Sequence, residues 1–409
     1  MIKIPDAIKP ILDEINKYGV AVIVGGFIRD AVLGIKSNDI DIEVFNIKNP
    51  DILQKIVQKF GFANLVGKSF GVFKINIKGY MLDIALARVE KKISSGHKGF
   101  KVSFIDNFNY KQAAKRRDFT INSIGYDTKT DKILDPYNGI LDLKNKTLNY
   151  INEHSFIEDP LRVFRAIVFC ARFNLTCTDT LLQKCKFLAD EHYIDELAKE
   201  RISGELQKLL LLSKNPSTGF KLFTQMHLNI YFPELLHVKN NFLYLDNMVK
   251  LKTGDKKTDI ILMLCVIVFD FPSLYETNTF LDKITNDGYI KKEVQNLFLH
   301  KSSLKNITSS RITNYKIYKL STTVNIKHLL LINKAREVEY KSIKTTALKL
   351  DVLTKKPEPV ISGKDLINLG LKPSKEFSVI LNKAYDAQLR ELFFSKPGAI
   401  KWLKNYLSL

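Results

Sequence analysis

Val-Gly-Gly-Phe-Ile-Arg-Asp-Ala-Val-Leu-Gly-Ile-Lys-Ser-Asn-Asp-Ile-Asp-Ile-Glu, residues 24–43, is the stretch that decides the fold of the first part of this chain. The apolar run at residues 20–24 predicts a strand, which ends in Gly25–Gly26. Arg29 then lies on the first turn of an expected helix. Glycines at the end of a strand let backbone N–H groups approach a phosphate group, and the start of a helix favours an anion. This half of the stretch therefore indicates a phosphate-binding turn.

The other half of the stretch carries Asp39 and Asp41 on a short alternating run that predicts a second strand. Residues i and i+2 of a strand point to the same side, and two carboxylates held in that way repel each other unless a cation lies between them. Hard oxygen ligands of this kind suit Mg²⁺ bridged to substrate phosphates. Alone, a Gly-Gly pair is usually a turn and an Asp-x-Asp usually faces solvent. Together, within about 20 residues, they favour metal-assisted nucleotidyl transfer.

Length and charge set bounds on the protein. Its 409 residues, 45% of them hydrophobic, are enough for two to four domains with a sizeable core, and they argue against disorder. The formal net charge of +20 favours a polyanionic partner, because positive patches attract phosphate backbones over long range. Compositional drift in an AT-rich genome explains the preference for Lys better than it explains the surplus of charge.

Cysteine spacing and hydropathy indicate the cellular compartment. The four cysteines form no C-x-x-C pair, which predicts reduced thiols and no zinc site; they are Cys170, Cys177, Cys185 and Cys265. The N-terminus has no signal pattern, and the longest apolar run, Ile260–Phe269, has ten residues, too few to cross a bilayer. We therefore expect a cytoplasmic protein with no membrane partner.

Hydrophobic periodicity predicts an α+β first part and a helical remainder. Alternating runs in the first 145 residues predict strands at Ala21–Val24, Ile40–Phe45, Val72–Ile77, Tyr80–Leu86 and Phe119–Tyr126. Helices are expected after Gly26 and over Asp51–Lys59, and a turn at Asp135–Gly139 closes this part. Helical spacing dominates from about Glu158, through Leu161–Phe173, Leu181–Leu188 and Ile202–Leu212. Lys355–Pro359 predicts a linker before a last helical segment.

A second motif, Arg-Arg-Asp-Phe-Thr-Ile-Asn at Arg116–Asn122, places two guanidiniums, a carboxylate and an amide at an expected strand entry. Arginine presents fork-shaped donors to phosphate or ribose oxygens, and Asn122 can hydrogen-bond a ribose hydroxyl. The alternative is a surface ion pair at the start of the strand.

A third motif lies at Glu158–Arg165. Pro160 suits the first turn of a helix, with Asp159 as its N-cap, and Arg162 follows on the same face. An Asp acceptor beside an Arg donor matches the pairing edges of cytosine and adenine and leaves hydrogen bonds unmade with guanine or uracil. Such a pair can select nucleotides without a template. The alternative is a purely structural cap.

These motifs, in this order, resemble the class II CCA-adding enzymes of bacteria, tRNA nucleotidyltransferases of the polymerase-β superfamily. The resemblance covers roughly residues 20–210, and the C-terminal segment Ile361–Gly370 also resembles the tail of the bacterial members. The matching segments are Val24–Asp30, Asn38–Glu43, Asp83–Arg88, Gly96–Phe100, Arg116–Asn122, Asp135–Gly139, Glu158–Arg165 and Glu200–Glu205.

The resemblance implies a polymerase-β-like nucleotidyltransferase head with a mixed sheet, followed by an all-helical neck, body and tail. The expected divisions are a catalytic head at 1–145, a neck with the base-reading motif at 146–212, a body at 213–350 and a tRNA-binding tail at 351–409. The implied reaction adds CCA to tRNA by in-line attack of its 3′-hydroxyl on the α-phosphorus of CTP or ATP. Pyrophosphate leaves, and two Mg²⁺ ions would activate the attacking oxygen and stabilise the leaving group.

The resemblance also implies roles for matching residues. Asp39 and Asp41 would be catalytic and hold the Mg²⁺, with Asp83 a possible third carboxylate on the neighbouring strand. The residues expected to bind the nucleotide are Gly25, Gly26, Arg29, Arg117, Asp118, Asn122, Asp159, Arg162 and Arg165. Among these, Asp159 and Arg162 would read the base, with Arg165 in support.

The chain departs from the family pattern in three places. Many relatives carry a further Arg one turn after Arg165, where this chain has Val168, and Arg172 is a candidate to compensate. The apolar segment at 262–270 has no His-Asp pair, so we expect no phosphohydrolase activity. The stretch at 110–115 lacks the acidic residues that are common there.

Several alternative functions remain compatible with the sequence. Gly96 and Gly99 permit a mobile loop of the kind that switching from C to A implies, which argues weakly against a CC-adding enzyme. An A-adding enzyme and a bacterial poly(A) polymerase share the same motifs, and a catalytically silent RNA-binding protein on this fold is the rival from another class. Exposed lysines expected to contact tRNA phosphates are Lys250, Lys252, Lys256, Lys257, Lys301, Lys305 and Lys355–Lys356.

Overall fold

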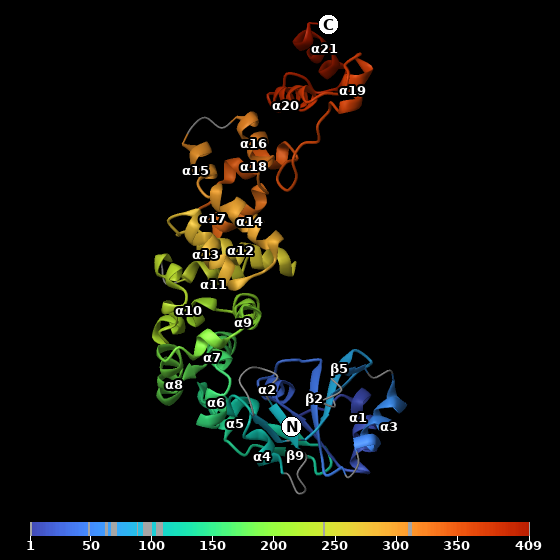
Figure 1. Cartoon of the computed structure of the whole chain (residues 1–409), viewed down its shortest axis with the longest axis vertical. Helices are drawn as coiled ribbons and strands as arrows, with labels where there is room; N and C mark the ends of the chain where they lie inside the picture. The colour runs from blue at the N-terminus through green and yellow to red at the C-terminus, as the bar shows by residue number, and fades with distance from the viewer. Residues whose placement is uncertain are drawn as a thin grey trace. The chain divides into compact units, whose positions relative to one another are not determined.

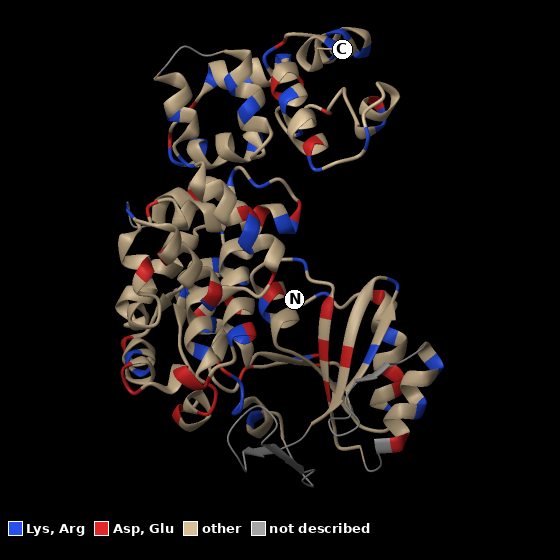
Figure 2. Cartoon of the chain, turned by 45° about the horizontal axis from the view of Figure 1, so that its top comes forward, with Lys and Arg blue, Asp and Glu red and all other residues tan. Residues whose placement is uncertain are grey.

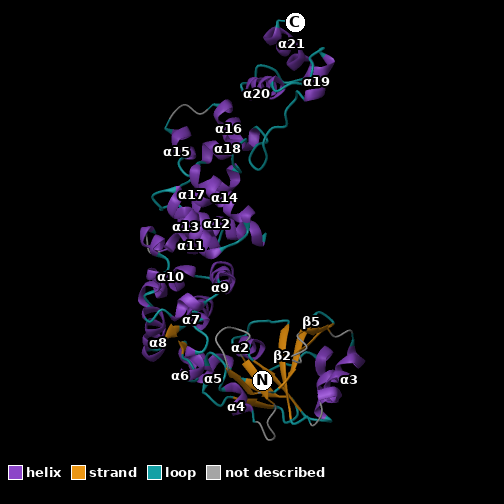
Figure 3. Ribbon diagram, in the orientation of Figure 1, coloured by secondary structure: helices purple, strands orange, loops and turns teal. Residues whose placement is uncertain are grey.

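The computed structural model describes residues 2–47, 50–61, 64–66, 72–87, 89–92, 100–103, 109–239, 242–309 and 313–408. The chain divides into two compact units, one formed by Met1–Leu209 with Thr218–Ile230 and the other by Leu210–Ser217 with Tyr231–Leu409. The first unit contains the sheet, and the second is helical (Figure 1, Figure 3). The expected α+β class is thus confirmed, while the finer division at residues 145, 212 and 350 stays a prediction.

The first unit is built on a seven-stranded sheet with the order β3-β4-β5-β2-β1-β8-β9. Strand β1 runs antiparallel to β2 and β8, whereas β2 runs parallel to β5, so the sheet is mixed as expected. The strands are β1 (Val20–Val24), β2 (Asp39–Phe45), β3 (Asn64–Val66), β4 (Val72–Ile77), β5 (Tyr80–Leu86), β8 (Gly125–Asp127) and β9 (Lys132–Leu134). Separate two-stranded pairs join β6 (Val89–Lys92) to β7 (Phe100–Ser103) and β10 (Thr147–Leu148) to β11 (Thr176–Cys177).

Four of the five expected strands are confirmed to within one residue, but the expectation for Phe119–Tyr126 was wrong over most of its length. Residues Thr120–Asn122 form a 3₁₀ turn, and only Gly125–Asp127 joins the sheet. The turn forms because Ser123 N–H donates to Thr120 O over 3.0 Å and the Ser123 hydroxyl donates to the same oxygen over 2.7 Å. Local polar bonds have displaced the ladder that the apolar spacing suggested.

The centre of the sheet places acidic residues on one side of β2. Ile40, Ile42 and Val44 are buried, while Asp39 and Asp41 on the alternate side are exposed. In the strand register, Asp41 lies opposite Val24 of β1 and beside Asp83 of β5. The end of β1 therefore meets the carboxylates of β2, as expected from the opening stretch.

Helices flank the sheet and continue beyond it. Those of the first part of the chain are α1 (Lys9–Asn16), α2 (Gly26–Val32), α3 (Pro50–Phe60), α4 (Tyr110–Ala114), α5 (Gly139–Asn145), α6 (Glu153–Ile157), α7 (Leu161–Phe173), α8 (Asp179–Asp190), α9 (Lys199–Leu212) and α10 (Pro216–Gln225). Each helix expected in this range is confirmed. Helix α7 starts one residue later than expected, so its N-cap is Pro160, although Asp159 Oδ1 still accepts from Leu161 N over 3.3 Å.

The second unit is a succession of helices. They are α11 (Leu243–Val249), α12 (Lys256–Val268), α13 (Leu274–Ile284), α14 (Gly288–Leu299), α15 (Ser303–Thr308), α16 (Asn314–Ser321), α17 (Ile326–Ala335), α18 (Lys341–Lys349), α19 (Gly363–Asn368), α20 (Glu376–Leu389) and α21 (Lys396–Leu407). The long apolar run belongs to α12, which is buried from Asp259 to Val268 and forms the core of the unit. No helix within the described ranges is long and apolar enough to cross a membrane.

Two of the expected tRNA-facing lysines were wrongly assigned as exposed. The part-buried Lys252 donates to Leu211 O over 2.7 Å, and burial lowers its pKa. Lys301 is also part-buried, and its ammonium donates to Phe269 O and Phe271 O over 2.9 and 3.0 Å. Both lysines satisfy backbone carbonyls, so their charges serve the fold.

We predict that Gly139→Ala destabilises the first unit. Gly139 begins α5 against the 3₁₀ turn, and a Cβ atom there would lie 2.2 Å from Thr120 O. Backbone must move to admit it, which costs about 1–3 kcal/mol. The control Gly204→Ala meets nothing within 4 Å inside α9 and should be neutral or slightly stabilising. Urea unfolding followed by circular dichroism compares the two; equal stabilities would contradict the prediction.

Candidate nucleotide-binding and catalytic site

The turn between β1 and α2 brings three expected site residues together, namely Gly25, Asp41 and Arg117. Gly25 has a φ of 69°, which strains any residue with a side chain. A Cβ atom on Gly25 would lie 3.0 Å from Arg117 Nη1 and 3.6 Å from Asp41 Oδ2. A Cβ atom on Gly26 would lie 3.6 Å from Arg29 Nη2. Position 25 therefore favours glycine for both its backbone angle and its lack of a side chain, whereas the contact at Gly26 is an ordinary van der Waals distance.

Asp39 and Asp41 project from the same side of β2, and both are exposed. Desolvation by the surrounding protein raises the pKa of Asp41 despite the nearby charge of Arg117, and Asp83 raises it further. A carboxylate destabilised in this way gains from a bound cation.

The third carboxylate is engaged elsewhere. Asp83 lies beside Asp41 in the register, but its side chain forms an ion pair with Lys74 of β4. Within the described part of the chain, no three acidic, His or Cys side chains gather into a metal-binding group. Asp39 and Asp41 fit a hard divalent cation only if substrate oxygens and water complete its shell, as is usual for Mg²⁺.

Glu43 holds the two arginines of the second motif. It is the third acidic residue on this side of β2 and is 6% exposed. Arg116 Nη2 and Arg117 Nη2 donate to the same oxygen, Oε1, over 2.7 and 2.8 Å. Although burial opposes it, these two charges lower the pKa of Glu43. Glu43 therefore fixes Arg117 beside Gly25.

Arg29 lies at the centre of a second cluster. Arg29 is 5% exposed, and its guanidinium donates from Nε and Nη2 to Asp30 Oδ1, over 2.8 and 2.6 Å. Nη1 donates to Asn122 Oδ1 over 2.7 Å. Desolvation lowers the pKa of Arg29, although Asp30 opposes this effect. The structure thus joins Arg29 to Asn122, two residues separated by 93 positions in the chain.

Asp118 extends this cluster to the helices beyond the sheet. Its Oδ1 accepts from Asn122 Nδ2 and Phe119 N, both over 2.8 Å. Its Oδ2 accepts from Arg165 Nε of α7 over 2.7 Å, and Arg165 Nη1 lies 3.8 Å from Glu205 of α9. Burial would raise the pKa of Asp118, but Arg165 and the bond from Asn122 bring it below its ordinary value.

The two expected base readers are not bonded to each other. Both oxygens of Asp159 accept from Arg201 Nη2 of α9 over 3.0 Å. Arg162 Nη2 donates to Arg116 O over 2.7 Å, and Nη1 lies 3.4 Å from Arg117 O. Each reader is therefore held by a separate partner.

Sequence reasoning missed four residues that organise the site: Asp30, Glu43, Arg201 and Glu205. Two of them had a usable signal, because Glu43 continues the alternation of Asp39 and Asp41, and Asp30 directly follows Arg29. Val168 is 4% exposed and belongs to the core. Arg172 lies 3.8 Å from Asp30 Oδ2. The expectations for Arg88, Gly96 and Gly99 fall outside the described residues.

Known proteins are similar to this chain in sequence and in fold. The family described as "Poly A polymerase head domain" matches residues 21–149. A CCA-adding enzyme of Francisella tularensis subsp. novicida is 31% identical over 319 residues, which cover 72% of this chain and 83% of that protein. Other curated relatives of 34–36% identity match over 44–57% of their own length.

Solved structures show the same fold along the chain. The Bacillus stearothermophilus CCA-adding enzyme in complex with CTP has a TM-score of 0.76 at 18% identity and covers 99% of this chain and 98% of its own. The Thermotoga maritima CCA-adding enzyme complexed with tRNA_CCA has a TM-score of 0.68 at 22% identity and covers 99% and 97%.

Fold and comparisons together define a nucleotidyltransferase of the polymerase-β superfamily. Such enzymes depend on a metal ion. The chain belongs to the family of CCA-adding enzymes.

We predict that Asp118→Asn lowers stability and flattens its acid dependence. Because the folded pKa of Asp118 is depressed, its stabilisation is present above the ordinary carboxyl value near pH 4 and is lost as pH falls through the lower folded value. Removing the charge leaves the part-buried Arg165 with only Glu205, at 3.8 Å, as an acidic partner among the described residues, at a cost of about 2 kcal/mol at pH 7. The only tryptophan, Trp402, lies in the second unit, so urea unfolding is followed by circular dichroism. An unchanged slope between pH 4 and pH 2 would contradict this.

Proposed function

We propose that this protein adds CCA to the 3′ end of tRNA without a template, using CTP and ATP and releasing pyrophosphate. The observation that carries the proposal is the meeting of Gly25, Asp41 and Arg117 where β1 ends beside β2. Family membership supports the same reaction. We further propose that the protein works in the cytoplasm.

Each expected site residue has a role in this proposal. Asp39 and Asp41 hold Mg²⁺, which when bound supplies the charge that the attacking hydroxyl and the departing pyrophosphate need. The glycine turn leaves room for the triphosphate, and Arg117, held by Glu43, directs Nη1 toward it. The residues proposed to contact triphosphate or ribose are Gly25, Gly26, Arg29, Arg117, Asp118 and Asn122.

The base-reading proposal rests on Asp159 and Arg162, with Arg165 in support. Arg201 orients the Asp159 carboxylate through both oxygens. Oδ1 also accepts from Leu161 N, whereas Oδ2 keeps a second lone pair for an amino group of cytosine or adenine. Arg162 is anchored by the Arg116 carbonyl, and its planar fork keeps further N–H donors for the ring acceptor. Rigid readers favour selection by hydrogen bonds left unmade with the wrong base.

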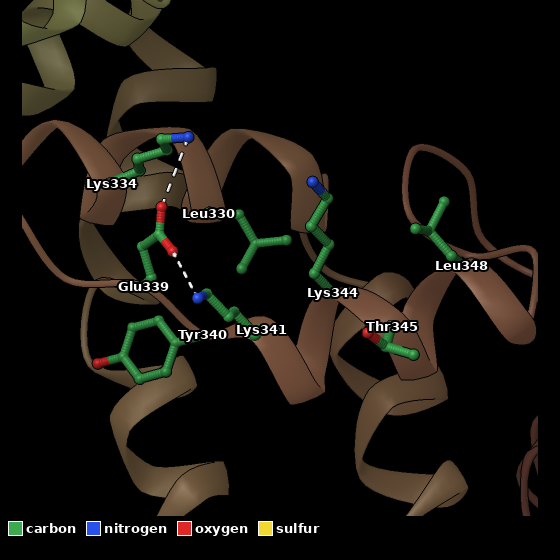
Figure 4. Close-up of a pocket in the computed structure, with 8 residues that line it drawn as sticks. All are labelled: Leu330, Lys334, Glu339, Tyr340, Lys341, Lys344, Thr345 and Leu348. Carbon is green, nitrogen blue, oxygen red and sulfur yellow. Dashed lines mark ion pairs between the residues drawn. The ribbon is translucent and has the colours of Figure 1, made fainter.

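A basic pocket in the second unit supports tRNA as the partner. It has a volume of about 480 Å³ and lies against α17 and α18 (Figure 4). Three lysines line it, of which Lys334 and Lys341 pair with Glu339 over 3.5 and 3.8 Å. Lys344 has no acidic partner among the described residues, and blue segments mark Lys and Arg on many of the helices (Figure 2). Such charges recognise the phosphates of A-form RNA.

We predict that Asp41→Ala abolishes nucleotide incorporation, by at least about 1,000-fold, because the charge that balances the metal is lost. The assay incubates purified protein and Mg²⁺ with tRNA transcripts that lack CCA, end in C or end in CC, with CTP, ATP or both, and measures nucleotide incorporation. Binding of tRNA should persist in the variant.

The products separate the alternatives. Addition of C-C-A followed by a stop supports the proposal. Addition of A alone to CC-ending tRNA indicates an A-adding enzyme, and a stop after CC indicates a CC-adding one. Long A tails on unrelated RNA indicate a poly(A) polymerase. Failure to incorporate any nucleotide, with Asp41→Ala equal to wild type, indicates a silent RNA-binding protein.

We predict that Lys344→Gln weakens tRNA binding and reduces the slope of log affinity against log salt by about 1, since one phosphate contact is lost. Filter binding over a range of salt measures this. The control Lys129→Gln removes an equal charge from the exposed turn between β8 and β9. An equal change in both variants would mean that net charge, and not the pocket, accounts for the effect.

A further inference from the structure

Asp30 is a buried carboxylate that stands between two guanidiniums from different helices. It follows Arg29 on α2, is 5% exposed, and accepts both Nε and Nη2 of Arg29 on one oxygen, Oδ1. Its other oxygen, Oδ2, lies 3.8 Å from Nη2 of Arg172 on α7. Asp30 is therefore the shared anion of α2 and α7.

The contacts of Arg29 hold its guanidinium in a single orientation. One edge of the guanidinium is bound to Asp30, and the remaining Nη1 donates to Asn122 over 2.7 Å. The rings of Phe173 and Phe169, both on α7, lie 4.6 and 5.2 Å from Arg29 Cζ. A planar fork with three of its five N–H donors and its face engaged in this way cannot rotate without breaking several contacts at once.

The charge of Asp30 matters more than its shape. The positive charge of Arg172 acts unfavourably on Arg29, since it lowers the pKa of that guanidinium. The negative charge of Asp30 lies within 3.8 Å of both guanidiniums and offsets this repulsion. An amide at position 30 keeps the size and an acceptor oxygen but removes the charge that holds the two helices together.

We propose that Asp30 is a positioning residue for nucleotide selection. By holding Arg29 and Arg172, it sets the spacing between the Gly25–Gly26 turn and the face of α7 that carries Arg162. The inference rests on the proposed function, in which the turn receives the triphosphate and α7 reads the base. A nucleotide spans both places, so a change in their spacing moves the base away from its readers and leaves the carboxylates of β2 where they are.

The test is Asp30→Asn in the full-length protein, with a tRNA transcript that lacks CCA and each of CTP and UTP as the single nucleotide. We expect the ratio of kcat/KM for CTP to that for UTP to fall about 10-fold. The fall should arise mainly from a higher KM for CTP. A purely structural role would lower both rates together and leave the ratio unchanged, and that outcome would overturn the proposal.

The matched control is Asp270→Asn in the second unit. Asp270 forms a comparable ion pair with Arg336, at 2.7 and 3.3 Å, in which the Asp270 and Arg336 side chains are 6% and 13% exposed. Arg336 also lies over aromatic rings, those of Phe269 and Tyr244. This variant should keep the wild-type ratio of CTP to UTP. An equal fall of the ratio in both variants would overturn the proposal.

Arg172→Gln keeps the test decisive should Asp30→Asn fail to fold. It removes the link from α7 and leaves Asp30 bound to Arg29, so the ratio should fall by about 3-fold. In the double variant the two effects should be less than additive, because both act through one contact. A wild-type ratio in Arg172→Gln would overturn the proposal. A wild-type protein that incorporates no nucleotide would instead overturn the proposed function, so the two failures are distinguishable.

Discussion

The structure of the first unit depends on one buried carboxylate, that of Asp118. Removing a carboxylate from water is costly unless its oxygens are fully satisfied, and here Phe119 N–H, Asn122 and Arg165 supply the donors. Two of these donors, Phe119 and Asn122, lie at the 3₁₀ turn that forms in place of a strand. The bond from Asn122 to Asp118 also orients the side-chain amide oxygen of Asn122 toward Arg29. Through Arg165, Asp118 also joins the sheet to α7. One solvation requirement thus links the parts that the proposed chemistry uses.

The same requirement explains why so many proposed site residues are already paired. Glu43 binds Arg117, Asp30 binds Arg29, and Arg201 binds Asp159. Each long side chain has therefore lost its rotamer freedom before a substrate arrives, so that loss does not weaken binding. For an enzyme proposed to select nucleotides without a template, rigid readers substitute for the geometry that a template strand would provide.

Local patterns predicted what local forces control. The alternation in β2 and the apolar spacing of α7 gave correct strands and helices, because burial of one face is decided over a few residues. The Phe119–Tyr126 strand was wrong since side-chain bonds of Asp118 and Ser123 compete with the ladder. The exposure of Lys252 was wrong since its acceptor, Leu211 O, lies 41 residues away in the chain.

The sequence alone was enough to predict the α+β class, the order of the elements and the residues that gather at the end of β1. Hydrophobic spacing and turn-forming residues act over a few neighbouring positions, so they can be recognised without the tertiary structure. The sequence could not determine which charges pair. Arg29 meets Asn122 across 93 residues, and Arg201 meets Asp159 across 42. Only the tertiary structure decided these partners, since a buried charge takes whichever opposite group the packing brings within reach.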